Sequence, residues 1–479
     1  MSPSDEALDA APEDAGRHTR GWIVPAIIGS ALLMQTLNAT VISNALPAMA
    51  HTFHVEPLRL NIAITVYLLS AAIFLPLSGW LADRFGARRI FMGSIVLYAA
   101  GSIACGLAGG MWQLIAARFI QGAAGATLMP VGRLVLLRTT PKSELVGALS
   151  VVTMPALLGP VFGPVLGGAI VTFADWRWIF FMNLPIAVTG LILVHRFVPE
   201  VREADAPPVD VLGILLTGAG LAALIFGFEN LSRDALPPLA VAALFAGGVA
   251  ALALYGWHAR RTPHAAVDLS IFRLPTFAAS VLGGAFMRVA MGANPFLLAM
   301  LLQVAFGLSA FVAGTMTCIS AIGALLMKTA APPILRRFGF RSVLLINAVI
   351  VALSFMAYAL FTPSWPHWAV ALVLGVGGFF RSLQFTSLNG MAYADIEQAQ
   401  MSKAATTSSM AQQLVQSIGI GLSATLLHYL MVWRGETRLT AAAVSPAFVI
   451  IGVVTLFSTI WFLRLPKDAG DEMNGRLRD

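Results

Sequence analysis

Charged residues are scarce in this chain. Asp, Glu, Lys and Arg make up 11% of its 479 residues, whereas soluble domains carry about 25%. Hydrophobic residues make up 58%, and the mean hydropathy is +0.81. This composition excludes a string of ordinary soluble domains. Apolar runs of about 20 residues, the length that a helix needs to cross a bilayer, recur along nearly the whole chain. The sequence therefore predicts an all-α polytopic membrane protein.

Signatures of several other protein classes are missing. The sequence has no glycine-rich phosphate loop that ends in Lys-Ser or Lys-Thr, so we do not expect ATP to drive it. It has no His-Glu-x-x-His motif and no acid pair within an apolar run, which argues against proteolysis. We therefore expect no enzyme activity, no cofactor and no bound metal. The net charge of +7 is carried mainly by loops on one side of the membrane, so we expect no nucleic-acid partner.

Cysteine is also rare. Cys105 and Cys318 both fall inside apolar runs, where they are expected to be small core residues rather than a disulfide. The first 21 residues are polar and acidic and have neither a basic segment nor a small-residue cleavage site. We therefore do not expect a removable signal peptide, and we expect residues 1–21 to form a cytoplasmic tail.

The apolar runs predict fourteen transmembrane helices, which places both termini on the same side. Loops and tails on that side carry 20 of the 30 Lys and Arg residues, the opposite loops carry 5, and 5 lie within helices. By the positive-inside rule, both termini are cytoplasmic. The predicted helices lie at about 22–46, 60–81, 90–108, 112–137, 145–171, 178–195, 211–229, 237–257, 276–302, 309–331, 342–361, 367–389, 404–431 and 446–463.

An internal repeat divides these helices into two sets of six. "LADRFGARR" at 81–89 is echoed by "ILRRFGFRS" at 334–342, and both stretches follow the second helix of a set. We therefore predict a six-helix bundle at 22–196, an inserted helix pair with its linkers at 197–275, a second six-helix bundle at 276–464 and a cytoplasmic tail at 465–479. Duplicated helical halves are typical of transporters with a binding site between them.

Five short stretches resemble motifs of one transporter family. "GWLADRFGARR" at 79–89 resembles the helix 2–3 signature of the major facilitator superfamily, and "RFIQGAAGA" at 118–126 resembles its helix 4 motif. "GPVFGPVLGG" at 159–168 is similar to the helix 5 motif of its antiporters, and "LNATVISNALP" at 37–47 to the helix 1 motif of its fourteen-helix drug:proton antiporters. "RSLQFTSLNGMAYADI" at 381–396 is similar to one bacterial subgroup. The resemblance implies a multidrug exporter of the inner membrane that works by alternating access.

The resemblance also implies a gate in the 79–89 stretch, with Gly79, Asp83, Arg84, Gly86 and Arg88 as its residues. The glycines permit close packing and a tight turn. Asp83 can pair with the positive end of a neighbouring helix, or with Arg84 and Arg88. We therefore expect a charged latch on the cytoplasmic face, which holds one conformation of the transporter.

The helix 5 stretch places Gly159, Gly163 and Gly167 on one helical face, with Pro160 and Pro164 between them. Small residues let helices approach closely in lipid, and prolines bend a helix. Helix packing alone explains this antiporter motif. Its link to export comes from the resemblance.

The resemblance assigns proton coupling to helices 1 and 4, at Asn38 and Arg118. Both residues are expected about 9–12 Å from the outer surface, so their side chains can meet. In the family, position 38 is usually an aspartate that carries the proton and pairs with the arginine. This chain departs from the family there, because an asparagine neither titrates nor neutralises an arginine. All 23 Asp and Glu residues fall in tails, loops or helix ends.

The predicted interior is cationic and rich in amides. Charged side chains within membrane helices are costly and mark functional candidates. We expect a substrate cavity lined by Gln35, Asn38, Arg288, Asn294, Arg381, Gln384, Gln412 and Gln416. Arg133 and Lys328 also lie within helices, and both can equally reach the interface by snorkelling. Each amide can equally serve as a hydrogen bond between helices.

Three functions remain open on the sequence. The first is a proton-coupled exporter of drug-like molecules or metabolites. The second is a proton-independent facilitator or exchanger of anionic or zwitterionic substrates, which the cationic interior favours. The third is a membrane sensor that transports nothing, against which the short tails argue. The expected partners are a small-molecule substrate, the lipid bilayer and, for the first function, protons. We expect a monomer.

Overall fold

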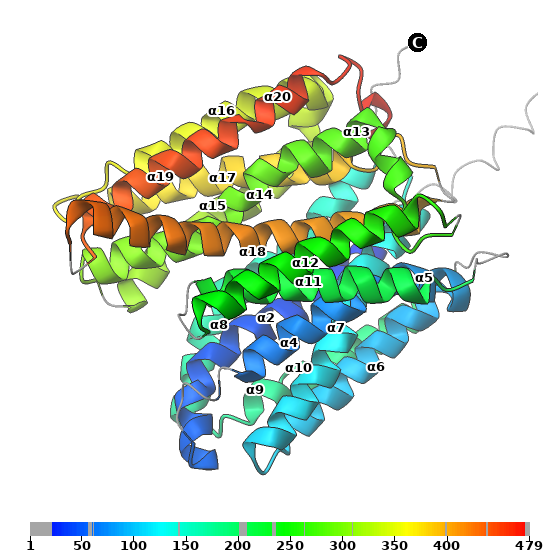
Figure 1. Cartoon of the computed structure of the whole chain (residues 1–479), viewed down its shortest axis with the longest axis horizontal. Coiled ribbons are helices and arrows are strands. Elements are labelled where there is room, and N and C mark those ends of the chain that lie inside the picture. Colours follow the sequence, from blue (N-terminus) through cyan, green and yellow to red (C-terminus); the bar gives the residue numbers. More distant parts are fainter. Residues whose placement is uncertain are drawn as a thin grey trace, which may run out of the picture.

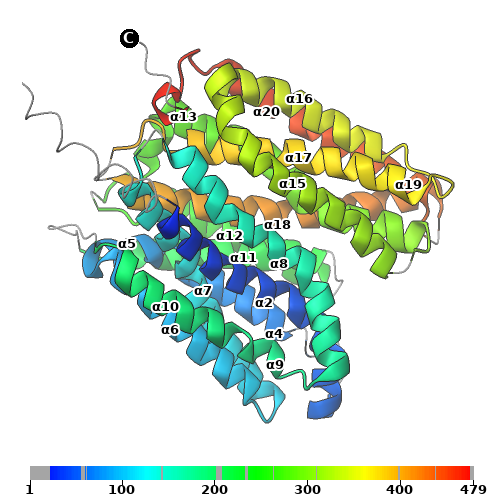
Figure 2. The same cartoon turned by 180° about the vertical axis from the view of Figure 1, so that it is seen from behind.

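The fold is that of a computed structural model, shown in Figures 1 and 2. It describes residues 22–55, 60, 62–141, 144–200, 208–231, 236–262, 264–308, 310–397, 400–436 and 439–474. Within these ranges the chain forms helices and turns and no β-strand. The predicted tail at 1–21 and the last five residues of the predicted tail at 465–479 lie outside the described residues.

The first half of the chain forms one group of helices, coloured blue to teal in Figure 1. Its members are α2 (Ile23–Phe53), α4 (Ile62–Phe74), α5 (Leu77–Phe85), α6 (Ala87–Gly106), α7 (Met111–Thr139), α8 (Leu145–Phe173), α9 (Trp178–Phe181) and α10 (Asn183–Phe197). The axes of α4 and α5 differ by 56°. Pro76 lies at this break, and a proline interrupts the hydrogen bonds of a helix.

The second half forms the other group, coloured green to red. It contains α13 (Pro275–Ala278), η3 (Ala279–Gly283), α14 (Gly284–Ala299), η4 (Met300–Ala305), α15 (Ala310–Phe338), α16 (Phe340–Tyr358), α17 (His367–Met391), α18 (Met401–Arg434), α19 (Ala441–Leu456) and α20 (Ser458–Leu463). Short 3-10 segments η2 (Leu269–Arg273) and η6 (Asp471–Asn474) flank it.

The multi-pass architecture agrees with the sequence. In the described part of the chain, eleven helices are long and apolar enough to cross a membrane, or twelve if α4 and α5 form one span. Helices α2 and α8 run for 31 and 29 residues, but their apolar stretches of described residues are shorter, at Ile23–Asn38 and Leu145–Pro155. The all-helical membrane fold is thus confirmed, whereas the count of fourteen spans stays a prediction.

The two copies of the repeat adopt the same turn. Gly86 joins α5 to α6 with φ +97°, and Gly339 joins α15 to α16 with φ +74°. Residues with a side chain rarely adopt such angles, so glycine is needed at both points. The shared Arg-Phe-Gly sequence therefore encodes a shared local structure, a helix that reverses without an intervening loop.

A third group, a single pair of helices, lies between the two halves (Figure 1). Helix α11 (Val211–Leu231) packs on α12 (Pro238–Ala259), on α4 of the first half and on α18 of the second. Two glycines make these contacts close: a Cβ added at Gly218 would lie 2.8 Å from the Ile73 carbonyl oxygen, and one at Gly421 would lie 2.9 Å from that of Phe228. The pair thus touches both halves through backbone. The predicted domain boundaries stay a prediction.

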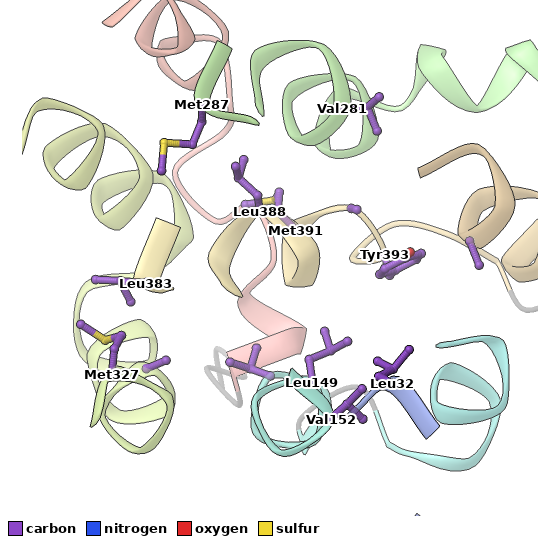
Figure 3. Close-up of a cluster of buried hydrophobic side chains, with 14 of the residues drawn as sticks. Leu32, Leu149, Val152, Val281, Met287, Met327, Leu383, Leu388, Met391 and Tyr393 are labelled. Carbon is purple, nitrogen blue, oxygen red and sulfur yellow. The ribbon is translucent and has the colours of Figure 1, made fainter. Parts of the chain in front are cut away.

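One cluster of buried apolar side chains runs across the seam between the halves. Leu32 of α2 and Leu149 and Val152 of α8 belong to the same cluster as Met327 of α15 and Leu383 of α17. Figure 3 shows Leu32, Leu149 and Val152 grouped together and Met327 beside Leu383, and α8 packs on both α15 and α17. The halves are therefore in apolar contact in this conformation, and a transporter must break such a contact to open there.

A cluster of hydrogen bonds around Asp210 joins the linker after α12 to the start of α11. Asp210 accepts from the backbone N–H groups of Gly213 at 2.8 Å and Ala266 at 3.0 Å, and its Oδ1 lies 2.8 Å from His258 Nε2. Burial alone would raise the pKa of Asp210, but these hydrogen bonds outweigh it and hold the pKa below its usual value. The ionised carboxylate therefore stabilises this cluster of hydrogen bonds.

We expect Asp210→Asn to destabilise the protein at pH 7 by about 1.5–3 kcal/mol, the range for hydrogen bonds to a charged group. The folded pKa lies below the unfolded value of about 3.9. The contribution is therefore present at neutral pH and lost as the pH falls through the folded pKa. Melting temperatures at pH 7 and near pH 3 check this, with the exposed Asp468→Asn as the control. An equal loss at both pH values would contradict it.

Candidate functional site

Arg118 lies in the interior of the first half, with 0% of its surface exposed. Its Nη1 donates to Gln121 Oε1 at 2.6 Å, and its Nε donates to the Ala63 carbonyl oxygen at 3.3 Å. The guanidinium carbon also lies 4.3 Å from the centre of the Tyr67 ring, in a cation–π contact. An amide, a backbone carbonyl and an aromatic ring thus surround the charge for which the resemblance implies a carboxylate partner.

Asn38 is buried on α2 and contacts Tyr98 of α6. Its Nδ2 donates to the Tyr98 hydroxyl at 2.8 Å, and its Oδ1 has no hydrogen-bond partner among the described residues. The sequence allowed Asn38 and Arg118 to meet; their hydrogen bonds run instead to Tyr98 and to Gln121. Sequence reasoning missed both partners. Gln121 could have been found, because it follows Arg118 by one helical turn.

Several predicted cavity residues use their polar groups within their own half. Gln35 donates to a backbone carbonyl of α7 at 3.3 Å. Gln384 accepts from Asn347 at 2.8 Å, and Gln412 donates to Asn389 at 3.0 Å. These bonds join neighbouring helices, which is the structural role that the sequence left open for each amide.

Asn294 and Gln416 are the two predicted cavity amides that differ from this pattern. Asn294 Oδ1 is buried without a hydrogen-bond partner among the described residues, and Gln416 is half-buried. An unused acceptor and a partly accessible amide are both groups that a ligand can bind.

The cations of the second half also lack carboxylates. Arg381 donates from Nη1 to the Tyr358 hydroxyl and from Nη2 to Ser320 Oγ, each at 2.7 Å. Lys328 donates to Thr386 Oγ1 at 2.7 Å. In the part of the chain that the structure describes, no carboxylate forms an ion pair with any of the five cations within the predicted helices, which are Arg118, Arg133, Arg288, Lys328 and Arg381. The interior is therefore cationic, as the sequence indicated.

Arg288 differs from Arg118 and Arg381. It is 1% exposed, and its Nη1 donates to the Ser280 carbonyl oxygen at 2.7 Å. Its Nε and Nη2 have no hydrogen-bond partner among the described residues. A buried guanidinium with unused donors is poised to bind an acceptor from outside the chain.

The predicted latch lies at a contact between the two halves. Asp83, at the end of α5, accepts from Arg138 of α7 at 3.0 Å and from the Ser402 hydroxyl of α18. Arg88, which we expected near Asp83, donates instead to His195 of α10. Arg84 is exposed. The latch partner from the first half is thus Arg138, in the last turn of α7 and one residue beyond the helix predicted at 112–137. No local spacing could reveal this partner.

Gly79 lets α5 approach α18 at the same end of the molecule. A Cβ added there would lie 2.6 Å from Thr406 Oγ1, and Ser78 Oγ lies 3.4 Å from that oxygen. Hydroxyl groups and a glycine thus form the contact beside Asp83. The two halves are closed against each other at this end, which the sequence predicts to be cytoplasmic.

The antiporter motif packs α8 against α2. Gly159, Gly163 and Gly167 are buried, and a Cβ added at Gly159 would lie 2.7 Å from Thr36 Cβ. The side chains of Pro160 and Pro164 lie outside the described residues. Close helix packing, the simpler of the two interpretations, accounts for the glycines.

Comparison with known proteins places this arrangement in context. The family model described as "Major Facilitator Superfamily" matches residues 28–293. A protein of Salmonella typhimurium (strain LT2) named "Putative multidrug resistance protein MdtD" is 35% identical over 458 residues, which cover 93% of this chain and 95% of that protein. The protein of the same name from Salmonella typhi is 34% identical over the same length.

Two solved structures share the fold. The human organic anion transporter MFSD10 (TETRAN) matches with a TM-score of 0.66 at 14% identity, over 92% of this chain and 99% of that chain. The proton:xylose symporter XylE matches with a TM-score of 0.66 at 16% identity, over 95% and 97%. At such identities the likeness extends to the fold alone.

We expect Gly79→Val to open the contact between α5 and α18, because the added methyl groups collide with Thr406. Such overpacking costs about 1–3 kcal/mol, enough to depopulate the closed arrangement. Spin labels on cysteines at positions 85 and 338, which are exposed phenylalanines on opposite halves, measure the separation. Gly93→Val is the matched control, since a Cβ there meets nothing within 4 Å. Unchanged label distances in Gly79→Val would contradict the expectation.

Proposed function

Because the chain belongs to the major facilitator superfamily, we propose that it exports small molecules across the bacterial inner membrane by alternating access. The observation that carries this proposal is the Asp83 contact, where α5 and α7 of one half meet α18 of the other. A bond between halves that breaks when one face opens is what alternating access requires. The multidrug resistance name of the Salmonella relatives supports drug-like substrates.

The proposed orientation follows the charge distribution. Both termini and the Asp83 end face the cytoplasm, so the conformation described above is closed toward the cytoplasm. In this scheme Asp83 holds the cytoplasmic face shut through Arg138 and Ser402. Release of the latch admits substrate from the cytoplasm. We propose that a monomer suffices, because both halves of the carrier lie in one chain.

Proton coupling is the first form of this function. In the family the helix 1 carboxylate takes up and releases the proton. Asn38 offers Tyr98 the donor that a protonated carboxylic acid would offer. Asn38 therefore resembles a carboxylic acid that stays protonated. Any proton coupling in this chain must use another residue.

A second form drops proton coupling. A proton-independent facilitator or exchanger of anionic or zwitterionic substrates is favoured by five cations buried within the helices. None of these five has a carboxylate partner among the described residues, namely Arg118, Arg133, Arg288, Lys328 and Arg381. Substrate anions would then supply the charge that the protein lacks.

Flux in proteoliposomes with and without an imposed pH gradient tests the proposal. Ethidium serves as a cationic probe and benzenesulfonate as an anionic one. We expect saturable flux of at least one probe. Flux that follows the gradient supports the proton-coupled form, and flux that ignores it supports the second. No flux of either probe, or of a wider panel of drugs, would contradict the transport function and favour a sensor.

We expect Asn38→Asp to add pH dependence to transport, because it restores a titratable group to helix 1. A single carboxyl can change the rate by at most about tenfold per pH unit. The rate of flux between pH 5 and 8 checks this. Asn183→Asp is the control: Asn183 is an equally buried amide of the first half that donates to Ser102. If the pH profile of Asn38→Asp stays that of the wild type, position 38 has no coupling role.

A further inference from the structure

Two buried arginines, one from each half, lie near a single tyrosine at the seam between the halves. Arg133 lies on α7 of the first half, and its Nη1 donates to the hydroxyl of Tyr393 in the second half at 3.3 Å. Arg288 lies on α14 of the second half, close enough to both residues to interact with them electrostatically. Arg133 is 6% exposed and Arg288 1%. Two positive charges from opposite halves thus share one buried region.

The donors of this cluster exceed its acceptors. A guanidinium has five N–H groups, and Arg288 uses Nη1 on the Ser280 carbonyl oxygen while its Nε and Nη2 remain without a partner in the described chain. The Tyr393 hydroxyl is a neutral group and cannot balance two cations. Asp395, two residues further on, is exposed and accepts from Thr276.

Arg118 and Arg381 do not share this imbalance. Arg118 donates to Gln121 and Ala63 and stacks on Tyr67. Arg381 uses both terminal nitrogens on neighbouring hydroxyl groups. Those two are accommodated by the protein alone, whereas the Arg133–Arg288 cluster has free donors and an unbalanced charge.

We propose that Arg133, Arg288 and Tyr393 form a binding site for the carboxylate, or a similar anionic group, of the transported substrate. A carboxylate has the acceptors that two guanidinium groups and a hydroxyl lack, and arginine pairs with it through two parallel hydrogen bonds. This assigns a substrate class to the transport function proposed above and rests on it. The site is sealed from solvent in this conformation, so substrate enters it from another state of the cycle.

Anion binding at this position favours the closed arrangement. Without an anion, Arg133 and Arg288 repel each other across the seam. An anion that contacts both converts this repulsion into attraction, and a ligand that binds one state more tightly shifts the population toward it. The substrate thus helps to close the transporter around itself.

Equilibrium binding to the purified full-length chain tests the site. Three probes share one apolar body: 4-phenylbutyrate, 4-phenylbutanamide and 4-phenylbutylammonium. We expect the carboxylate to bind at least tenfold more tightly than the amide or the ammonium. Arg288→Gln and Arg133→Gln should each weaken carboxylate binding by roughly 10–100-fold, as expected for loss of a charge-assisted hydrogen bond. Binding of the neutral amide should change little.

Two controls keep the result interpretable. Arg196→Gln removes an exposed positive charge and should leave all three affinities unchanged. Arg288→Lys keeps the charge and should retain part of the preference, and it replaces Arg288→Gln if that variant fails to fold. Equal affinities of the wild type for the three probes, or equal losses for all probes in the variants, would overturn the site. Carboxylate binding without flux would instead contradict the transport function.

Discussion

Positive charge buried without negative charge is the constraint around which this interior is built. A charged group inside the membrane is tolerated only if other groups replace the water that it has lost. Here those groups are neutral. Arg118 uses an amide, a carbonyl and an aromatic ring, and Arg381 uses two hydroxyls. Lys328 uses one hydroxyl. Neutral polar side chains of the helices therefore lie where these buried cations can donate hydrogen bonds to them.

This constraint links packing to chemistry. A neutral acceptor stabilises a cation less than a carboxylate does, but it costs less to bury and does not titrate near neutral pH. In this conformation the interior therefore carries cations whose hydrogen-bond acceptors are all neutral at Arg118, Lys328 and Arg381. The departure at position 38 is consistent with it, because Asn38 supplies a donor and no charge. In the anion-binding form that we propose, selectivity for the charge of the substrate follows from the composition of the interior.

Much of the fold could be predicted from the sequence because membrane helices are encoded locally. The apolar runs located the helices, and the repeated Arg-Phe-Gly located the two tight turns at Gly86 and Gly339. The site was harder to predict. The partners of Asn38 and Asp83, namely Tyr98, Arg138 and Ser402, lie on other helices. Which residues face one another depends on the rotation of each helix about its axis, and a weakly amphipathic membrane helix does not record that rotation in its sequence.

The contacts of α11 limit how the molecule can move. Through Gly218 it rests on the backbone of α4, and through Phe228 it rests on Gly421 of α18. Its first turn is bound to the linker by Asp210, and Asp268 of that linker lies 3.8 Å from Lys403 of α18. The helix pair is thus attached to both halves. If the halves rock as proposed above, α11 must change its packing against α4, against α18 or against both, so the extra pair takes part in the motion.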